Sequence, residues 1–439
     1  MRSETATLCA SLLSFLVVAC TSQTQSPSDA SSRPPNLIVI MTDDQAYRDW
    51  QAHDERIHTP NLMKLAREGF VLENYHAMVA CSPTRAALLT GRYGQRTGVT
   101  GILNYSPRDR RFMRLEEVTV AEVLRAAGYS TALIGKWHLA DRPGIVEHYG
   151  FDYFYGFLRG ATRYQNPHNF FRNADPLGVF EGYATDLFAD EAVAFIEQNQ
   201  DRPFFLLVCP NAPHEPLVGA REDLAHYPEA QFSNKQRHYY ATVTSVDRAV
   251  GRIRGALEAL GLAEDSILVF TSDNGTGLRP RSKATLYARG SHVPFIVWAP
   301  NRIAPGRSSA LVGVLDLFPT FVEWAGAAPP DGVVLDGLSL APTLRGEGPP
   351  EEDRIKFREL GSNYSAFNRH HRLLLTNRHS GSLHAELFDL EKDPDESQNL
   401  LAAGRADAHP TYQRLKAAIT EWQRETRGDP NWKLPRVAE

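Results

Sequence analysis

The sequence contains little cysteine. There are four cysteines in 439 residues, Cys9, Cys20, Cys81 and Cys209, and so few exclude a disulfide-built scaffold. An excess of one charge is also lacking, because 47 Lys and Arg against 52 Asp and Glu leave a formal net charge of -5. This balance gives no argument for a nucleic-acid partner, so any site for a polyanion must be local. With 42% hydrophobic and 23% charged residues, the composition is that of a soluble enzyme with a large core.

The N-terminal residues have the features of a targeting segment. Residues 8–19 form an apolar stretch that is too short to span a bilayer and typical of a signal peptide, so we expect residues 1–19 to be removed on export. Residues 17–20 (VVAC) resemble a bacterial lipobox, which predicts lipidation of Cys20 and attachment to the bacterial cell envelope through that lipid only. Cleavage after Ala19 without lipidation, giving a periplasmic or secreted protein, is the alternative. Residues 20–35 are rich in Ser, Thr and Pro and are expected to form a flexible tether.

Alternating strand and helix patterns predict an α/β fold. Apolar runs at residues 36–41, 129–134, 204–209 and 266–271 are typical of buried strands. Helical patterns lie at 61–68, 119–127, 183–199 and 239–260, followed by a strand at 293–299 and a helix at 313–325. We expect a mainly parallel central sheet flanked by helices over residues 36–330. Strands at 371–376 and 385–390 and a helix near 411–426 predict a smaller C-terminal α+β subdomain, residues 331–439, with a short antiparallel sheet.

Polar residues follow the first and fourth apolar runs. Asp43 and Asp44 come after the first, and Asp273 and Asn274 after the fourth. Singly, an Asp in this position is ordinarily a turn former or a helix cap. Ligands of open α/β sheets bind at the carboxyl ends of the strands, however, and four oxygen-bearing side chains gathered there suit a hard cation. We expect Ca²⁺, with Mg²⁺ as the alternative, because no His or Cys cluster has zinc spacing.

Basic residues follow the other strand ends. Lys136 and His138 come after the second run and lie on one side of an extended segment. His214 follows the third run between two prolines, and Lys283 lies in a basic loop after the fourth. Each one alone would be explained as a structural imidazole or a solvated base. Their convergence with the carboxylates at one sheet edge favours a functional site, because a purely structural core does not need acidic and basic side chains gathered there.

The segment from Cys81 to Arg92 (CSPTRAALLTGR) carries the most specific pattern. Ser82 as N-cap and Pro83 at the first helical position predict a helix that begins directly after Cys81. A thiol at the positive end of a helix dipole is a candidate nucleophile, whereas packing as a small buried hydrophobe is the ordinary alternative. For Cys209, which lies inside a predicted buried strand, packing is the preferred interpretation.

The pattern Cys-x-Pro-x-Arg followed by Ala-Ala-Leu-Leu-Thr-Gly-Arg resembles the signature of the type I sulfatases, the formylglycine-dependent branch of the alkaline-phosphatase-like superfamily. Similar segments extend over nearly the whole mature chain, at residues 35–45, 135–139, 212–214, 272–275, 283–294 and 386–400. The resemblance implies that a maturation enzyme oxidises Cys81 to formylglycine, whose hydrated aldehyde attacks the sulfur of a sulfate ester and then expels sulfate. Residues 288–292 (ARGSH) depart from the family pattern, which leaves substrate choice open.

The resemblance also implies roles for the residues at the strand ends. The implied ligands of one Ca²⁺ are Asp43, Asp44, Asp273 and Asn274. The residues implied to contact the formylglycine or the sulfate ester are Arg85, Lys136, His138, His214 and Lys283. Of these, His214 and Lys283 would assist the leaving oxygen, Asp273 would also act as a base, and the metal would polarise a sulfate oxygen.

Basic clusters between the motifs indicate a class of substrate. They are Arg108, Arg110, Arg111 and Arg114; Arg159, Arg163, His168 and Arg172; and Arg369, His370, His371 and Arg372. The aromatic neighbours that could stack on sugar rings, with packing inside the protein as an equal alternative, are Tyr105, Tyr164, Phe170 and Phe171. A shared cleft would favour a sulfated polysaccharide or oligosaccharide over a small aryl sulfate, with Arg163, His168, Arg369 and His370 as candidate contacts. A solvated face remains the ordinary explanation for any one cluster.

Two other functions stay open at the level of the sequence. One is hydrolysis of phosphonate or phosphate esters by the same aldehyde and metal. The other is a non-catalytic protein that binds sulfated glycans and in which Cys81 is never converted. The complete set of metal, Arg, Lys and His residues argues against the second, because a binding protein needs no nucleophile.

Overall fold

The computed structural model describes residues 33–105, 112–377, 382–401 and 409–437. The predicted signal peptide, Cys20 and most of the predicted tether lie outside the described residues, as do Arg108, Arg110 and Arg111. None of the helices within the described ranges combines the length and the apolar character that a membrane crossing requires.

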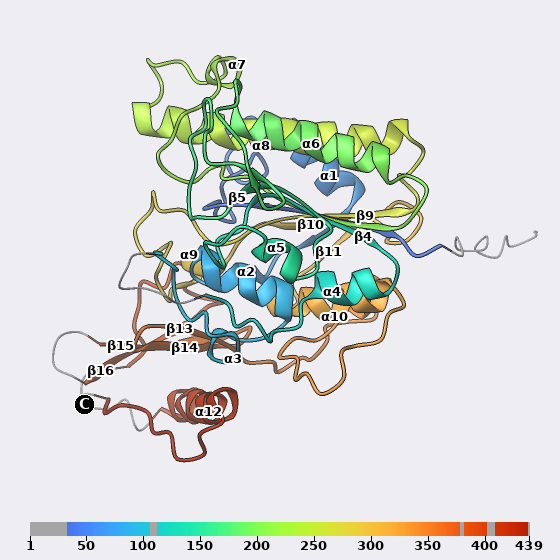
Figure 1. Ribbon diagram of the computed structural model, residues 1–439. Helices are drawn as coiled ribbons and strands as arrows, with labels where there is room; N and C mark the ends of the chain where they lie inside the picture. The colour runs from blue at the N-terminus through green and yellow to red at the C-terminus, as the bar shows by residue number, and fades with distance from the viewer. Residues whose placement is uncertain (1–32, 106–111, 378–381, 402–408, 438–439) are drawn as a thin grey trace, which may run out of the picture. The chain divides into compact units, whose positions relative to one another are not determined.

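A ten-stranded mixed sheet forms the centre of the described chain (Figure 1). Its five central strands are parallel neighbours in the order β9 (Ser266–Ser272), β1 (Asn36–Thr42), β8 (Phe204–Cys209), β4 (Ser130–Lys136) and β5 (Tyr153–Phe157). Beyond β9 lie β10 (Phe295–Trp298), β2 (Phe70–Leu72) and β11 (Gly306–Ser308), and beyond β5 lie β6 (Phe171–Arg172) and β7 (Asp175–Pro176). Every residue of β1, β8 and β9 is buried, which explains their uninterrupted apolar sequences.

Helices cover both faces of this sheet (Figure 1). On one face lie α1 (Pro60–Glu68), α6 (Ala184–Gln198) and α8 (Asn234–Ala259), and on the other α2 (Cys81–Thr90), α4 (Val120–Ala126), α5 (Ile145–His148) and α10 (Leu317–Trp324). The side chains of β1 alternate between the two apolar cores, because Leu37 and Val39 pack with the α2 and α10 side, and Ile38 and Ile40 with the α6 and α8 side.

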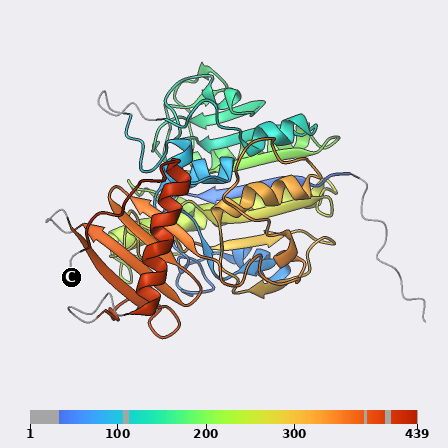
Figure 2. The ribbon, with the colours of Figure 1, turned by 90° about the horizontal axis from the view of Figure 1, so that it is seen from below.

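The C-terminal part contains a separate antiparallel sheet. Its order is β13 (Lys356–Leu360), β14 (Asn363–Phe367), β15 (His371–Asn377) and β16 (Leu383–Asp389), and α12 (Pro410–Arg427) crosses it (Figure 2). Trp422 of α12 stacks on Phe357 of β13 with ring centroids 4.9 Å apart. Leu373 and Tyr412 belong to the same apolar cluster as the α2 side of the main sheet. The boundary at residue 330 therefore stays a prediction.

The remaining short elements are β3 (Tyr75–His76), β12 (Val312–Gly313), α3 (Gly94–Thr97), α7 (Arg221–Leu224), α9 (Ala288–Ser291), the 3-10 helix η1 (Val314–Asp316) and α11 (Ala341–Leu344). The predicted fold class is confirmed, with the qualification that β10 runs antiparallel to β9. Helix α8 begins earlier than the apolar pattern predicts, because Ser233 and Gln236 form a capping box ahead of the first apolar residue.

Candidate active site

The carboxyl ends of four adjacent strands bring the predicted residues together. Because β9, β1, β8 and β4 are parallel neighbours, the segments that follow them meet at one edge of the sheet. Asp43 follows β1, Asp273 follows β9, and Lys136 ends β4, and all three side chains are fully buried. His214 arrives from the loop after β8 and is partly exposed. This carboxyl-edge site therefore combines charges of both signs in the protein interior.

Asp44 is the centre of the hydrogen bonds at this edge. Its Oδ1 accepts from Asn274 Nδ2 at 2.7 Å, and its Oδ2 accepts from Lys283 Nζ at 2.7 Å. Its backbone amide donates to Asp273 Oδ1 at 3.2 Å. A backbone φ of 72° places Asp44 in the left-handed region, which turns the chain so that Asp43 and Asp44 can both face the site. The two predicted metal-binding pairs are thus directly joined.

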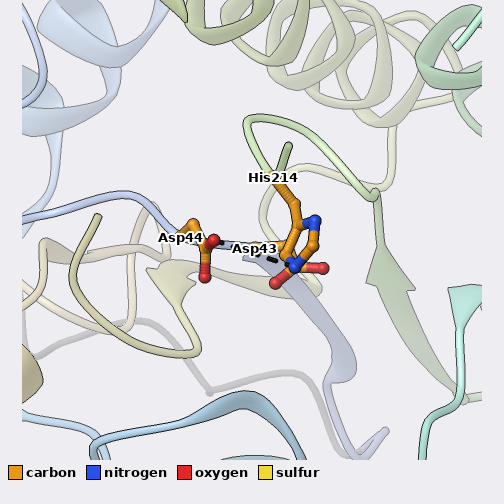
Figure 3. A group of neighbouring side chains, drawn as sticks. All are labelled: Asp43, Asp44 and His214. Carbon is orange, nitrogen blue, oxygen red and sulfur yellow. Dashed lines mark ion pairs between the residues drawn. The ribbon is translucent and has the colours of Figure 1, made fainter. Parts of the chain in front are cut away.

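Two buried oxygen atoms at the carboxyl-edge site have no hydrogen-bond donor among the described residues. Lys136 Nζ donates to Asp43 Oδ2 at 2.5 Å, but Asp43 Oδ1 is left without a partner, as is Asn274 Oδ1. A buried acceptor without a partner is costly, so these two oxygens fit ligation of a cation. The carboxylate oxygens of Asp43 and Asp44 and a ring nitrogen of His214 lie within 4.8 Å of one another (Figure 3).

Arg85 of α2 ties the helix to two strands. Its Nη2 donates to Asp273 Oδ2 at 2.8 Å, and its Nη1 donates to the Lys136 carbonyl at 2.8 Å. Burial first, and then the nearby Asp43 charge, raise the pKa of Asp273 to about 7, because Arg85 and Lys136 oppose these two effects only in part. Burial acts in the same direction on Asp43, but the charges of the surrounding cations, Lys136 first, outweigh it and hold the pKa of that carboxyl well below its usual range.

Cys81 is the first residue of α2, so the predicted N-cap and first helical residue, Ser82 and Pro83, are each two residues late. Ala80 is the extended N-cap, and the predicted N-cap, Ser82, instead accepts a hydrogen bond from the Leu103 amide at 3.2 Å through its hydroxyl. The helix ends at Gly91, whose φ of 65° suits a residue without a side chain. The Cys81 side chain is buried, and burial raises the pKa of its thiol despite the position at the helix N-terminus.

One ring nitrogen of each of the two histidines lies against a backbone carbonyl. His138 Nε2 lies 2.9 Å from the Leu103 carbonyl, so it carries the proton, and its buried Nδ1 has no partner among the described residues. Burial, Lys136 and Arg85 lower the pKa of His138, which keeps the ring neutral. His214 Nδ1 lies 2.5 Å from the Glu215 carbonyl, which leaves His214 Nε2 free to face Asp44 Oδ2 at 3.9 Å (Figure 3).

Two tyrosines whose contacts at the site the sequence did not predict hold the site in place. The Tyr164 hydroxyl donates to the His214 carbonyl at 2.8 Å. The Tyr239 hydroxyl lies 2.6 Å from Asp49 Oδ2 and 3.2 Å from the Asp44 carbonyl. The sequence around each tyrosine gives no sign of these hydrogen bonds, because each hydroxyl binds a residue that is distant in the sequence.

The predicted substrate contacts lie on the surface, and no recorded hydrogen bond or ion pair joins them to the carboxyl-edge residues within the described ranges. Arg163, His168, Arg369 and His370 are all exposed. Arg159 pairs with Asp141 at 2.7 Å, and Arg172 pairs with Glu191 at 3.5 Å, so these arginines are engaged within the protein.

Some members of the basic and aromatic clusters have structural roles instead. Arg372 is fully buried, pairs with Glu396 at 2.6 Å and lies over the Phe367 ring at 3.9 Å. Tyr164 and Phe170 are buried, so of the two predicted alternatives, stacking on sugars and packing, packing applies to them. Their apolar surface is already used in the core on the α6 and α8 side of the sheet.

Comparisons with known proteins agree with this geometry. The sulfatase family model matches residues 35–327, and the model of the N-sulphoglucosamine sulphohydrolase C-terminal region matches residues 281–425. The chain belongs to the type I sulfatases of the alkaline-phosphatase-like superfamily. This confirms the family resemblance, and the protein is a sulfuric ester hydrolase.

Individual relatives of this sulfatase are similar over most of its length. Human arylsulfatase A is 33% identical over 463 aligned residues, which cover 88% of this chain and 87% of that protein. N-acetylgalactosamine-6-sulfatase of Canis lupus familiaris is 32% identical, with 72% of this chain and 66% of that protein covered. The crystal structure of Ps i-CgsB in complex with k-i-k-neocarrahexaose has a TM-score of 0.81 at 27% identity, covering 92% of this chain and 95% of that one.

Proposed function

We propose that this sulfatase removes sulfate from a sulfated polysaccharide or oligosaccharide, with a formylglycine formed from Cys81 as nucleophile and one bound Ca²⁺. The observation that carries the proposal is the pair of unpartnered buried oxygens, Asp43 Oδ1 and Asn274 Oδ1, at the sheet edge to which Arg85 of α2 is anchored. The proposed mechanism needs a nucleophile and a cation that polarises a sulfate oxygen. Cys81 and the two unpartnered oxygens offer a place for each at this edge.

The donor set favours a hard divalent cation. Asp43, Asp44, Asp273 and Asn274 would hold it through oxygen atoms, which Ca²⁺ and Mg²⁺ prefer, and Ca²⁺ is the ion that we propose. Such an ion would supply Lewis acidity toward a sulfate oxygen. His214 lies beside Asp43 and Asp44, and a role as a further ligand is an alternative to its assisting the leaving oxygen.

Cys81 is badly suited to act as a thiol. Its side chain is buried, and the raised pKa of the thiol means that the thiolate is scarce. Conversion to formylglycine by a maturation enzyme would supply a hydroxyl nucleophile and a second hydroxyl for the release of sulfate. This requirement is the physical support for proposing the modification.

The side chains around Cys81 can bind and orient a sulfate ester. Lys136 and Arg85 place positive charge at this edge, and Asp273, which accepts from Arg85 Nη2, would act as the base toward the attacking hydroxyl. Burial lowers the pKa of Lys283, but Asp44 and Asp43 raise it by more, so the ammonium persists. A lysine that stays charged can stabilise the negative charge on a departing oxygen.

A carbohydrate substrate is supported by the relatives and by the exposed basic residues. One relative is an N-acetylgalactosamine-6-sulfatase, and one similar structure holds a neocarrahexaose. We keep Arg163, His168, Arg369 and His370 as candidate contacts, since their side chains are accessible to a large ligand. Phosphonate or phosphate ester hydrolysis and non-catalytic glycan binding are not favoured by the family match.

The test is turnover of a sulfate ester and a phosphate ester of the same alcohol, followed by a panel of sulfated oligosaccharides and one aryl sulfate. We expect kcat/KM to be higher for the sulfate ester, and higher for at least one sulfated oligosaccharide than for the aryl sulfate. Preference for the phosphate ester would contradict the reaction class. Equal kcat/KM on the aryl sulfate and on every sulfated sugar would contradict the carbohydrate class.

We further propose export and lipid anchoring at the bacterial cell envelope, on the sequence of residues 1–35 alone. Metabolic labelling with an alkyne fatty acid should mark the mature protein, and Cys20→Ser should abolish the label. Labelling that survives this substitution, or a wild-type protein that is exported without label, would contradict the anchor.

A further inference from the structure

Lys283 lies on a loop without regular secondary structure. From the end of β9 to the start of α9, a stretch that the structure describes completely, the chain forms neither helix nor strand. We call residues 276–288 the lysine loop. Within it, Ala284 has a backbone φ of 56°, in the left-handed region that is costly for a residue with a side chain. The lysine loop therefore depends on contacts with other segments to keep its conformation.

The lysine loop lies between the start of α2 and the C-terminal sheet. The Ala284 amide donates to the carbonyl of Val79, two residues before Cys81, at 2.9 Å. Leu286 packs in one apolar cluster with side chains of β15 and β16. The loop thus joins the helix that carries the candidate nucleophile to the C-terminal part of the chain.

A buried ion pair in the C-terminal part faces the lysine loop. Arg372 Nε of β15 lies 2.6 Å from Glu396 Oε1 in the segment after β16, and both side chains are buried. We call these two residues the clamp pair. The turn that presents Glu396 is fixed by Asp393, whose carboxylate accepts from the Ser397 amide at 3.0 Å and from the Gln398 amide at 2.7 Å.

Three hydrogen bonds attach the clamp pair to the lysine loop. Glu396 Oε2 accepts from the Ala288 amide at 2.7 Å, and the Glu396 backbone carbonyl accepts from Arg281 Nη1 at 2.6 Å. Arg372 Nη1 donates to the Leu286 carbonyl at 3.4 Å. The attachment points lie on both sides of the lysine in the sequence. A carboxylate that accepts from a backbone amide forms a strong, directional bond, so the clamp pair restrains the loop backbone.

We propose that Glu396 and Arg372 are positioning residues, which hold the lysine loop so that the Lys283 ammonium stays beside Asp44 Oδ2 and faces the leaving oxygen of the substrate. The inference rests on the proposed function, in which this lysine stabilises the negative charge on that oxygen. The C-terminal part of the chain then assists departure of the leaving group without touching the substrate.

The test compares Glu396→Gln with the matched control Asp395→Asn. Asp395 is the preceding residue and pairs with Arg289 at 2.8 Å, so it also joins the two segments, but both of these side chains are exposed. For each variant kcat/KM is measured on 4-nitrophenyl sulfate and on phenyl sulfate, whose leaving oxygen is more basic and needs more assistance. We expect Glu396→Gln to lose about tenfold more on phenyl sulfate, mainly through kcat, and Asp395→Asn to lose less than about twofold on either. Equal losses of Glu396→Gln on both esters would overturn the proposal.

A second comparison asks whether Glu396 acts through Lys283. In Lys283→Ala protein, Glu396→Gln should lower kcat/KM on phenyl sulfate by less than about twofold, because the group that it positions is already gone. The same loss with and without the lysine would overturn the proposal. Because Glu396→Gln leaves Arg372 buried without a counter-charge, the double variant Glu396→Gln/Arg372→Gln, in which neither charge remains, is carried through the same measurements.

Hydrogen exchange separates this proposal from the proposed function, because it needs no turnover. Peptides from residues 276–288 should exchange faster in Glu396→Gln than in the wild type and in Asp395→Asn, whereas peptides from α1 should exchange at the same rate in all three. If the wild type cleaves no sulfate ester and the lysine loop still exchanges faster in Glu396→Gln, the proposed function fails and the clamp pair stands. If the wild type cleaves a sulfate ester and exchange in the loop is unchanged, only the clamp pair fails.

Discussion

Buried acceptor oxygens at the carboxyl edge of the main sheet have fewer hydrogen-bond donors than those of Asp316, where the C-terminal sheet joins the rest of the chain. Asp316 Oδ1 accepts from Arg354 Nη2 at 2.6 Å and from the Leu338 amide at 3.0 Å. Its Oδ2 accepts from Lys356 Nζ at 2.9 Å and from the Gly313 amide at 2.7 Å. Each oxygen of this Asp316 cluster thus has two donors, and the carboxylate needs nothing from outside the protein.

The carboxyl edge also buries charged side chains, but it leaves two acceptor oxygens without a hydrogen-bond donor. Asp43 Oδ1 and Asn274 Oδ1 have no donor among the described residues, although Lys136 and Lys283 stand close by. Burying an unsatisfied oxygen costs about 1–3 kcal/mol, so retention of two at one edge calls for a ligand that the protein alone does not supply. Both oxygens of Asp316 have donors, as in a structural ion pair, whereas the two acceptor oxygens without donors at the carboxyl edge fit a site for a cation.

The largest expected effect is on catalysis at the carboxyl edge. Cys81→Ala should lower kcat for a sulfate ester by about 10⁴-fold or more, because it removes the precursor of the nucleophile. Steady-state turnover of the purified protein measures this. The comparison is Cys209→Ala in β8, which should lose far less activity, because Cys209 lies beside Arg85 but is not the precursor of the nucleophile. Comparable losses of kcat in both variants would contradict the assignment of Cys81 as the precursor of the nucleophile.

The next effect is on stability at the Asp316 cluster. Asp316→Asn leaves Arg354 and Lys356 buried without a counter-charge, so the free energy of unfolding should fall by about 3–5 kcal/mol. Urea unfolding followed by circular dichroism measures it. The variant protein that remains folded should still respond to Ca²⁺. A variant as stable as the wild type would show that satisfied hydrogen bonds do not identify structural charge here.

A cation should stabilise the carboxyl edge and not the Asp316 cluster. At a Ca²⁺ concentration 100 times the dissociation constant, the wild type should gain about 2.7 kcal/mol in the free energy of unfolding after prior chelation. Asp273→Asn should lose this gain and at least about 10²-fold in kcat. Thermal unfolding with and without Ca²⁺ measures the first effect. Full stabilisation of Asp273→Asn by Ca²⁺ would exclude this carboxylate as a ligand.

The smallest effect is a difference in the sign of pH dependence between the two carboxyl groups in metal-free protein. The pKa of Asp273 rises on folding from 3.8 to about 7, so the folded state binds more protons, and this contribution to stability is lost as pH rises from about 4 to 7. The pKa of Asp316 is lowered, because Lys356 and Arg354 outweigh the burial that would raise it. Its contribution is therefore present above pH 3.8 and lost below.

The difference can be measured as unfolding free energy against pH in the presence of a chelator. Asp273→Asn should flatten the fall between pH 4 and 7, by roughly 1 kcal/mol for each unit of pKa shift removed. Asp316→Asn should leave that window unchanged and flatten the loss below pH 3.8. The same slope in wild type and Asp273→Asn would contradict the assignment of the raised pKa.

Sequence patterns predicted the residues of the carboxyl edge because this edge is formed by the ends of strands. The apolar runs of β1, β4, β8 and β9 are continuous, so the residues after them could be placed at one edge before any coordinates were known. The match around Cys81 then supplied the chemistry. The start of α2 was misplaced, because the Ser82 hydroxyl accepts from the Leu103 amide and does not cap the helix.

Features fixed by distant contacts were out of reach of the sequence. The Asp316 cluster joins residues from three segments, and no local sequence pattern indicates that Arg354 and Lys356 are buried. The short strand β2 exists because β10 and β11 pair with it on either side. Tyr164 lies in a basic and aromatic cluster, yet its hydroxyl reaches the His214 carbonyl across the fold.

The most direct test of the account is the mass of the peptide that contains Cys81, taken from protein that has been purified in active form from a host that carries the maturation enzyme. The account predicts the mass in which an aldehyde replaces the thiol, together with turnover of a sulfate ester that scales with the converted fraction. An unmodified thiol in protein that turns over the sulfate ester would contradict it.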